Sequence, residues 1–273
     1  GPTGRLDVLL VPDAVRVAQG VVEHRVDDTW EVLRPGAGVG EGTELRAPDG
    51  TATLEVRGGA VDLAEGTHLT VTAPGLRVAA GSVVVDAPAV VVGDGATEAN
   101  GPGTWRWDAT GRVGAYRGAV VVTDATDREV LVRPLEQVGV QDAVVTQSPR
   151  PYVYTDADTF DRQHLGTAIA VDDYVGALRR GLTGDYGTAP QPAAFYTDFD
   201  GLDGALVAAL GDVGFDRDGD RVGPPADVLV AAVVTDALVV EAGLAPQDAA
   251  DEVRTARLAG AAWGIVAQAR DLD

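Results

Sequence analysis

The sequence predicts an α+β chain in which an all-β first region is followed by a mainly α-helical region. Two observations predict it. Short apolar runs rich in Val, Leu and Thr alternate with glycine-containing turns as far as about residue 140, a pattern typical of β-strands. After residue 158, apolar residues recur at helical spacing instead. The chain has 273 residues, enough for one or two such domains.

The strands expected in the first region are rich in Val, a β-branched residue that favours extended backbone. Turn sequences such as Pro48-Asp49-Gly50 and Gly93-Asp94-Gly95 separate them. We expect strands over 15–22, 54–56, 61–63, 69–72, 76–78, 82–85, 90–92, 104–107, 113–116, 119–123 and 129–132. Their spacing suits a sandwich, and the run from 56 to 92 also suits the stacked rungs of a solenoid. The sequence leaves a solenoid-like arrangement and a sandwich open.

The second region is expected to contain four helices. Thr159 or Asp161 can cap the first helix, and Arg179-Arg180-Gly181 supplies cations and a glycine at its end. Pro246 suits the first position of the last helix, because its φ is already close to the helical value. We expect helices over 159–180, 202–210, 226–242 and 246–269.

These elements predict the domain organisation. Residues 1–4, Gly-Pro-Thr-Gly, resemble the remnant that a protease leaves after it removes an expression tag. Residues 5–145 are expected to form the β domain, 146–158 an extended connector, and 159–273 the helical domain. Because of the tag remnant, we expect the natural polypeptide to be longer, with any signal or membrane anchor outside this sequence.

The charge balance argues against some classes of partner. Forty-two acidic residues face 21 basic ones, which gives a net charge of −21. A surface of this sign repels the phosphate backbone, so we expect no nucleic acid partner, and it disfavours docking on anionic lipid. No run of 18 uninterrupted apolar residues occurs, so no direct membrane insertion is expected. The acidity fits either a surface adapted to a salty or alkaline habitat or the binding of a cation or basic partner.

Few groups in the sequence suit catalysis. There is no Cys, and the two serines, Ser82 and Ser148, do not lie in a Gly-x-Ser-x-Gly motif. The histidines, His24, His68 and His164, lack the spacing of metal ligands. No glycine-rich phosphate loop precedes a helix. We therefore predict that the chain is not an enzyme and has no catalytic residues.

One acidic cluster has the spacing of a calcium loop. Asp216, Asp218 and Asp220 would supply oxygen ligands at loop positions 1, 3 and 5, and Asp227 a carboxylate at position 12. The cluster resembles the loops of EF-hands and dockerin-like repeats, although Arg221 replaces the glycine of position 6. In the alternative interpretation these residues form a polar turn and Asp227 caps the next helix. Calcium, in a structural role, is the one cofactor that the sequence suggests.

Two tryptophans form a second candidate site. Trp105 and Trp107 are two residues apart in an expected strand, so their side chains share one face. On an exposed face they would bind a sugar or a protein partner. In the alternative interpretation they pack in the interior.

Glycines and apolar residues follow a particular order through residues 15–140. The order comprises 17–23 followed by Trp30, then Leu33-Arg34-Pro35-Gly36, 39–46, 50–54 with 59–63, 103–107, 113–122 and 132–137. In this order the β region resembles the FecR domain, in which 50–54 and 59–63 correspond to paired strands. Leu135 stands where the family has a glycine in its final turn.

The resemblance implies a bacterial domain that is exposed outside the cytoplasm, binds protein and is not an enzyme. The best-known members of the family are membrane-anchored and relay a signal from an outer receptor to a cytoplasmic sigma factor. We therefore expect an extracytoplasmic or cell-surface domain for envelope signalling or protein–protein interaction, with a protein partner in the cell envelope. One alternative is a calcium-stabilised structural or adhesive surface protein, and another is a carbohydrate-binding or carbohydrate-acting protein. The sequence does not determine the oligomeric state.

Overall fold

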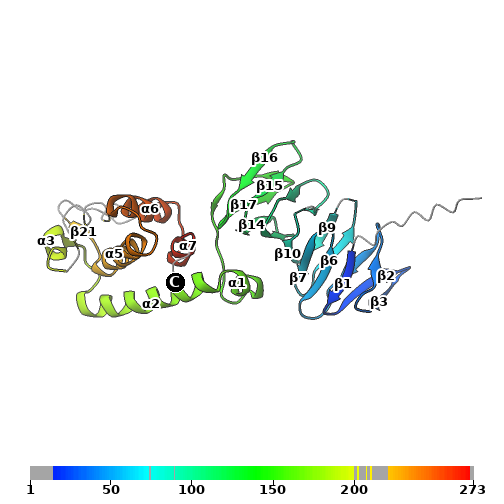
Figure 1. Cartoon of the computed structure of the whole chain (residues 1–273), viewed down its shortest axis with the longest axis horizontal. Helices are drawn as coiled ribbons and strands as arrows, with labels where there is room; N and C mark the ends of the chain where they lie inside the picture. The colour runs from blue at the N-terminus through cyan, green and yellow to red at the C-terminus, as the bar shows by residue number, and fades with distance from the viewer. Residues whose placement is uncertain are drawn as a thin grey trace, which may run out of the picture. The chain divides into compact units, whose positions relative to one another are not determined.

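A computed structural model describes residues 15–73, 75–88, 90–199, 202, 207, 210 and 221–270. Tertiary contacts divide the chain into two units, Gly1–Pro149 and Arg150–Asp273. The described part of the first unit is built from strands, and that of the second mainly from helices (Figure 1). The predicted α+β class with a β-rich first region is therefore confirmed.

The first unit contains two large sheets, here called sheet A and sheet B. Sheet A has the order β18-β17-β14-β13-β10-β7-β6-β1-β4, and sheet B the order β16-β15-β12-β11-β9-β8-β5-β2-β3. The strands of sheet A are β1 (Val15–Gln19), β4 (Gly38–Val39), β6 (Ala52–Val56), β7 (Gly59–Leu63), β10 (Ser82–Asp86), β13 (Thr104–Asp108), β14 (Arg112–Arg117), β17 (Glu136–Gln141) and β18 (Val144–Val145). Those of sheet B are β2 (Val22–Val26), β3 (Thr29–Leu33), β5 (Glu44–Arg46), β8 (His68–Val71), β9 (Gly75–Ala80), β11 (Val91–Gly93), β12 (Glu98–Asn100), β15 (Val120–Thr123) and β16 (Glu129–Val132).

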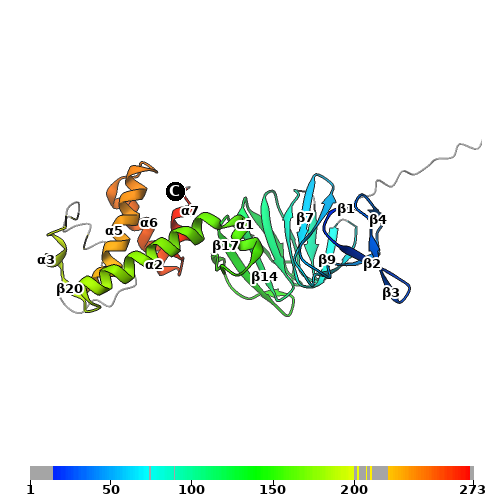
Figure 2. The same cartoon turned by 90° about the horizontal axis from the view of Figure 1, so that it is seen from below.

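The chain passes back and forth between the two sheets, often after a hairpin. β6 pairs with β7 in sheet A, and the next strands, β8 and β9, pair in sheet B. Figure 2 shows the neighbouring strands side by side. Buried residues from both sheets, among them Leu54, Leu63 and Leu69, belong to one hydrophobic cluster. Because alternate residues of a strand face the same side, each sheet has one apolar face in this common core.

The expected strand over 15–22 is interrupted at Gly20. This residue has a φ of +82°, and a Cβ atom here would lie 2.5 Å from the carbonyl oxygen of Thr51. Only glycine adopts this conformation at such close approach without strain. The chain therefore turns at Gly20, and β1 and β2 enter different sheets.

The second unit packs its helices around α5 (Pro225–Val240), which contacts α2 (Gly166–Tyr186), α6 (Pro246–Leu258) and α7 (Trp263–Gln268). Most residues of α5 are buried, as expected of a helix that is apolar on nearly every side. The other elements are α1 (Thr159–His164), α3 (Ala193–Tyr196) and the short strands β19 (Arg150–Pro151), β20 (Gln191–Pro192) and β21 (Arg221–Gly223). Within the described residues, no helix has both the length and the hydropathy needed to cross a membrane.

The expected helices differ from the observed ones mainly in their continuity. The prediction over 226–242 is confirmed by α5. The expected helix over 159–180 is divided at Leu165 into α1 and α2. The expected helix over 246–269 ends early because Gly260, with a φ of +89°, terminates α6. The prediction over 202–210 falls almost entirely outside the described residues.

Candidate functional site

Of the four tryptophans in the chain, Trp30 is the one that is not buried. It is half-buried on β3, which is the edge strand of sheet B. The other three, Trp105, Trp107 and Trp263, have exposed fractions of 0%, 2% and 6%. Tryptophan is among the residues that most often dominate the binding energy of an interface. The surroundings of Trp30 are therefore a candidate binding site.

Trp30 lines a pocket of about 660 Å³, here called the Trp30 pocket. Its wall is formed by Arg25, Asp28, Trp30, Arg46, Ala47, Pro48, Gly66 and His68. Arg46 and His68 adjoin the core residues Leu45 and Leu69, both fully buried. Alternation along β5 and β8 therefore places these two polar side chains on the face of sheet B opposite the core.

The register of sheet B brings these residues together from four strands. Arg25 lies opposite Trp30 in the β2–β3 hairpin. Arg46 lies opposite Glu23 on one side and opposite His68 on the other. Side chains at directly opposed positions of neighbouring strands are close enough to interact, so the pairing of β3, β2, β5 and β8 builds the pocket.

Two contacts hold the indole ring of Trp30. The guanidinium carbon of Arg46 lies 4.5 Å from the ring centroid, and the His68 ring meets the indole edge-to-face at 5.3 Å. Arg46 is itself held by Glu23, because its Nε donates a hydrogen bond to Glu23 Oε2 at 2.5 Å. Cation–π and edge-to-face contacts are both attractive. The aromatic face is thus ordered before any partner arrives, which lowers the entropic cost of binding.

The basic side chains beside Trp30 have carboxylate partners. Arg25 donates hydrogen bonds to Glu44 at 3.1 Å and to Asp28 at 3.4 Å, and the hydrogen bond with Glu44, followed by the charge of Glu44, raises the pKa of Arg25. The Nε2 atom of His68 lies 3.7 Å from the same Glu44 carboxylate. Exposed ion pairs add little stability. Their effect here is to fix polar side chains around an aromatic ring.

The tryptophan pair singled out by the sequence lies in a different environment. Trp105 and Trp107 are both on β13 and belong to the hydrophobic core of the first unit. With exposed fractions of 0% and 2%, they present no indole face to solvent on which a sugar or a protein surface would stack. Of the two interpretations, this burial supports packing.

Of the four candidate ligands in the predicted calcium loop, the described residues include one. Asp216, Asp218 and Asp220 lie outside the described residues. Asp227 lies in the first turn of α5, where its carboxylate forms an ion pair with Arg179 of α2. The N-cap residue of α5 is Pro224, and no side chain makes a capping hydrogen bond. The capping role considered for Asp227 is therefore wrong, while calcium binding stays a prediction.

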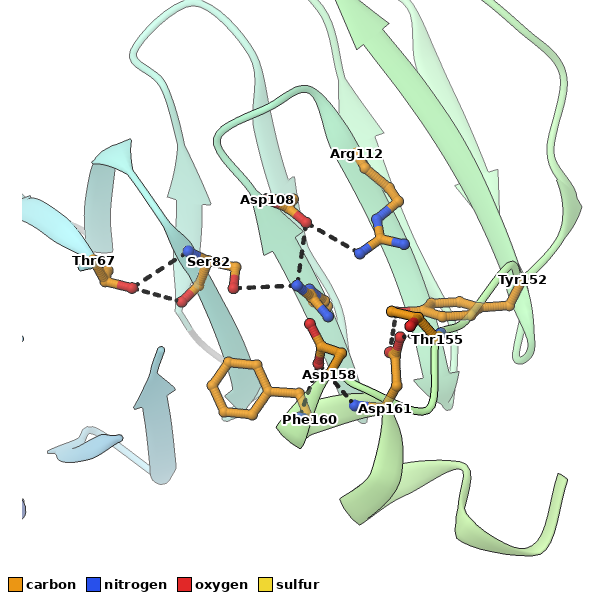
Figure 3. Close-up of polar contacts among 10 residues, drawn as sticks. Thr67, Ser82, Asp108, Arg112, Tyr152, Thr155, Asp158, Phe160 and Asp161 are labelled. Atoms are coloured by element: carbon orange, nitrogen blue, oxygen red, sulfur yellow. Dashed lines mark hydrogen bonds and ion pairs between the residues drawn. The ribbon is translucent and has the colours of Figure 1, made fainter. Parts of the chain in front are cut away.

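A buried network in the first unit involves Thr67 and Asp108 (Figure 3). The hydroxyl of Thr67 donates to the carbonyl of Ser82 at 2.9 Å and accepts from its N–H at 3.3 Å. Asp108 forms ion pairs with Arg106 at 3.3 Å and with Arg112 at 3.1 Å. These contacts satisfy polar groups that burial would otherwise leave unpaired.

Asp161, a fully buried carboxylate in the second unit, was not anticipated as such from the sequence. Its oxygens accept hydrogen bonds from the hydroxyl of Tyr152 and the backbone N–H of Thr155, both at 3.0 Å (Figure 3). Asp158 caps α1 by accepting from the N–H groups of Phe160 and Asp161. Both acidic residues thus organise the start of α1, as hydrogen-bonded caps do.

Among the described carboxyl groups of the second unit, Asp172 has a raised pKa, and burial is the main cause. The N–H of Gly264 donates to it at 3.0 Å, and the hydroxyl of Tyr154 also donates to it. Perturbed carboxyl groups mark functional sites when they lie in a cleft. Here the hydrogen bonds join α2 to the start of α7, which is a structural role.

The Trp30 pocket is thus the candidate site that combines a partly exposed aromatic group, ordered polar neighbours and a volume of about 660 Å³. No protein-family model, curated protein or solved structure matches the chain.

Proposed function

We propose that the chain is a non-enzymatic extracytoplasmic module for envelope signalling or protein–protein interaction, and that its protein partner docks at the Trp30 pocket. The observation that carries the proposal is the partly exposed Trp30, which contacts Arg46 and His68 at the edge of a large β-sheet. Tryptophan and arginine are the residue types enriched at binding hot spots. The bordering edge strand adds unpaired backbone groups that a partner can meet.

The FecR-like character of the β region is part of this proposal. It is supported by the hairpin of β6 and β7, whose pairing of Ala52 with Leu63 and of Val56 with Gly59 joins the two segments that the resemblance treats as paired strands. The extracytoplasmic location and the membrane anchor follow from the same resemblance.

The charge of the chain indicates the chemistry of the partner. A net charge of −21 attracts a basic surface over long range and repels an acidic one. The ion-paired Trp30 pocket would then supply the short-range contacts. We therefore expect association with a basic partner whose rate of binding falls as the salt concentration rises.

The test is affinity capture of envelope proteins from the organism that carries this chain, using the whole chain and two variants. Trp30→Ala removes the aromatic anchor. Leu131→Ala removes an exposed apolar side chain (51% exposed) from β16, the opposite edge strand of the same sheet. Capture of the same envelope protein should fall about tenfold or more with Trp30→Ala, since hot-spot residues contribute about 2 kcal/mol or more, and should be unchanged with Leu131→Ala.

Equal capture by the Trp30→Ala variant would show that the partner docks elsewhere. Capture of cytosolic proteins alone would contradict the extracytoplasmic location. Circular dichroism of each variant, compared with the parent chain, verifies that the variant keeps the overall secondary structure.

A further inference from the structure

Strand β3 ends sheet B and pairs with β2 on one side (Figure 2). It is the longest of the strands that end the two sheets, with five residues, compared with two each in β4 and β18 and four in β16. Natural sheets discourage further pairing with very short edge strands, prolines, bulges or charged side chains. β3 contains no proline and pairs without a bulge, and Glu31 is its one charged residue. This edge is therefore open to a further strand, with a restriction on charge only.

The backbone groups of Trp30 and Val32 point away from β2. The turn between β2 and β3 has two residues, and Val26 lies opposite Thr29 across it. In such a hairpin the residues that flank the turn exchange both hydrogen bonds, and hydrogen-bonded pairs then alternate with non-hydrogen-bonded pairs along the strands. Trp30 and Val32 occupy the non-hydrogen-bonded positions, and no backbone hydrogen bond of theirs to another element is found within the described ranges. Their N–H and C=O groups are therefore available to a strand added at this edge.

The side chains of β3 lie on two different faces of the sheet. Trp30 and Val32 share the face opposite the core, and Val32 is 64% exposed. Glu31, between them, lies on the other face and is also exposed. A strand added at this edge places alternate side chains opposite Trp30 and Val32 and the intervening one opposite Glu31. Apolar side chains suit the first positions, and a basic side chain suits the second, because opposite charges attract across neighbouring strands.

We propose that the protein partner binds by adding to β3 an extended segment in which apolar residues alternate with Lys or Arg. This inference rests on the proposed function, since it names the part of the partner that docks beside the Trp30 pocket. Backbone hydrogen bonds supply affinity in complexes of this kind, and the alternating side chains supply specificity. A second copy of the chain is a poorer occupant, because two molecules that each carry a charge of −21 repel each other.

The direct test uses the whole chain and a fluorescein-labelled synthetic peptide of alternating Lys and Val, slightly longer than β3. Fluorescence anisotropy at low salt measures its affinity, and hydrogen exchange followed by NMR measures the protection of single amides. The peptide should bind, and a peptide with Glu in place of each Lys should bind at least about tenfold more weakly, since like charges repel. The amides of Trp30 and Val32 should exchange at least about tenfold more slowly in the complex, because the added strand accepts their hydrogen bonds.

Val32 allows a matched pair of variants. Val32→Pro removes the outward N–H without removing a hydrogen bond to β2, and edge strands tolerate proline at such positions. Val32→Ala shortens the same side chain but keeps the N–H. Val32→Pro should bind the peptide about tenfold more weakly than Val32→Ala, because one hydrogen bond is lost, while Val32→Ala should stay within about threefold of the parent chain. Circular dichroism verifies that both variants keep the overall secondary structure.

The proposal is overturned if the peptide does not bind the parent chain, if the two Val32 variants bind it equally, or if the amides of Trp30 and Val32 are not protected. A dimer of the parent chain that Val32→Pro dissociates, as measured by analytical ultracentrifugation, would also overturn it, because the occupant would then be a second copy. In the affinity capture described above, loss of the envelope protein with Trp30→Ala but not with Val32→Pro would overturn strand addition and leave the proposed function intact. Capture that neither variant reduces would contradict the proposed function and the inference that rests on it.

Discussion

Trp30 and Trp105 belong to neighbouring layers of one β unit, yet they have opposite environments. Trp105 lies on a central strand of sheet A with no exposed surface, inside the common core. Trp30 lies on the edge strand of sheet B, partly exposed and bounded by ion-paired side chains. The comparison teaches that position in the sheet, and not residue type, separates a core tryptophan from one that reaches the solvent.

The largest loss of stability is expected for the variant Trp105→Ala. Removal of a fully buried indole leaves a cavity in the core, so we expect the free energy of unfolding to fall by about 3–5 kcal/mol. Urea denaturation monitored by circular dichroism measures it. A loss below about 1 kcal/mol would mean that Trp105 is not the core residue described here, and the contrast with Trp30 would disappear.

Replacement of Asp124 is expected to lower the stability by an intermediate amount, and this loss should depend on pH. This buried carboxylate accepts hydrogen bonds from the Thr126 hydroxyl and from backbone N–H groups, including that of Val145 on β18. The Thr126 hydrogen bond is the main cause that lowers the pKa of Asp124 to about 2. Since the pKa is lower in the folded state than the usual value near 4, this stabilisation is present above about pH 4 and is lost as the pH falls through about 2.

The variant Asp124→Asn should therefore unfold at a lower temperature than the parent chain at neutral pH, and the difference should shrink as the pH is lowered from about 4 to 2. Thermal unfolding followed across this range gives the measurement. The nearby exposed Asp127→Asn serves as the control and should keep the pH dependence of the parent chain. A constant difference between Asp124→Asn and the parent at every pH would show that the carboxylate charge is not what stabilises the turn.

The smallest loss of stability is expected for Trp30→Ala. This variant tests the same contrast with Trp105 at the solvent-exposed edge of the sheet. Trp30 is partly exposed, and its contact with Arg46 is a surface cation–π interaction. We expect a loss of about 1 kcal/mol or less in the free energy of unfolding, in contrast to a large loss of partner capture. A stability loss as large as that of Trp105→Ala would indicate that Trp30 is a core residue.

Part of the fold follows from local sequence. The apolar residues of α5 persist over four turns, and Pro225 at its start suits a first helical position, so the prediction over 226–242 succeeds. The breaks at Leu165 and Gly260 were not predicted because the apolar spacing continues across both. Periodicity shows which residues can share a helix face, and it does not show where the axis changes direction.

The candidate site could be predicted from the sequence less well than the fold. Trp105 and Trp107 attracted attention because they are two residues apart, and local spacing does show that they share a face. It does not show that the face is covered. Trp30, Arg46 and His68 are separated by 16 and 22 residues, and they meet only through the pairing of β3, β2, β5 and β8.

The sequence by itself determined the α+β class, the change from strands to helices, and the acidity that argues against nucleic acid partners. These properties depend on composition and short-range periodicity, which are local. Only the tertiary structure decided which tryptophan reaches the solvent and which polar side chains surround it. Strand order and register set both, and they result from contacts between residues far apart in the chain.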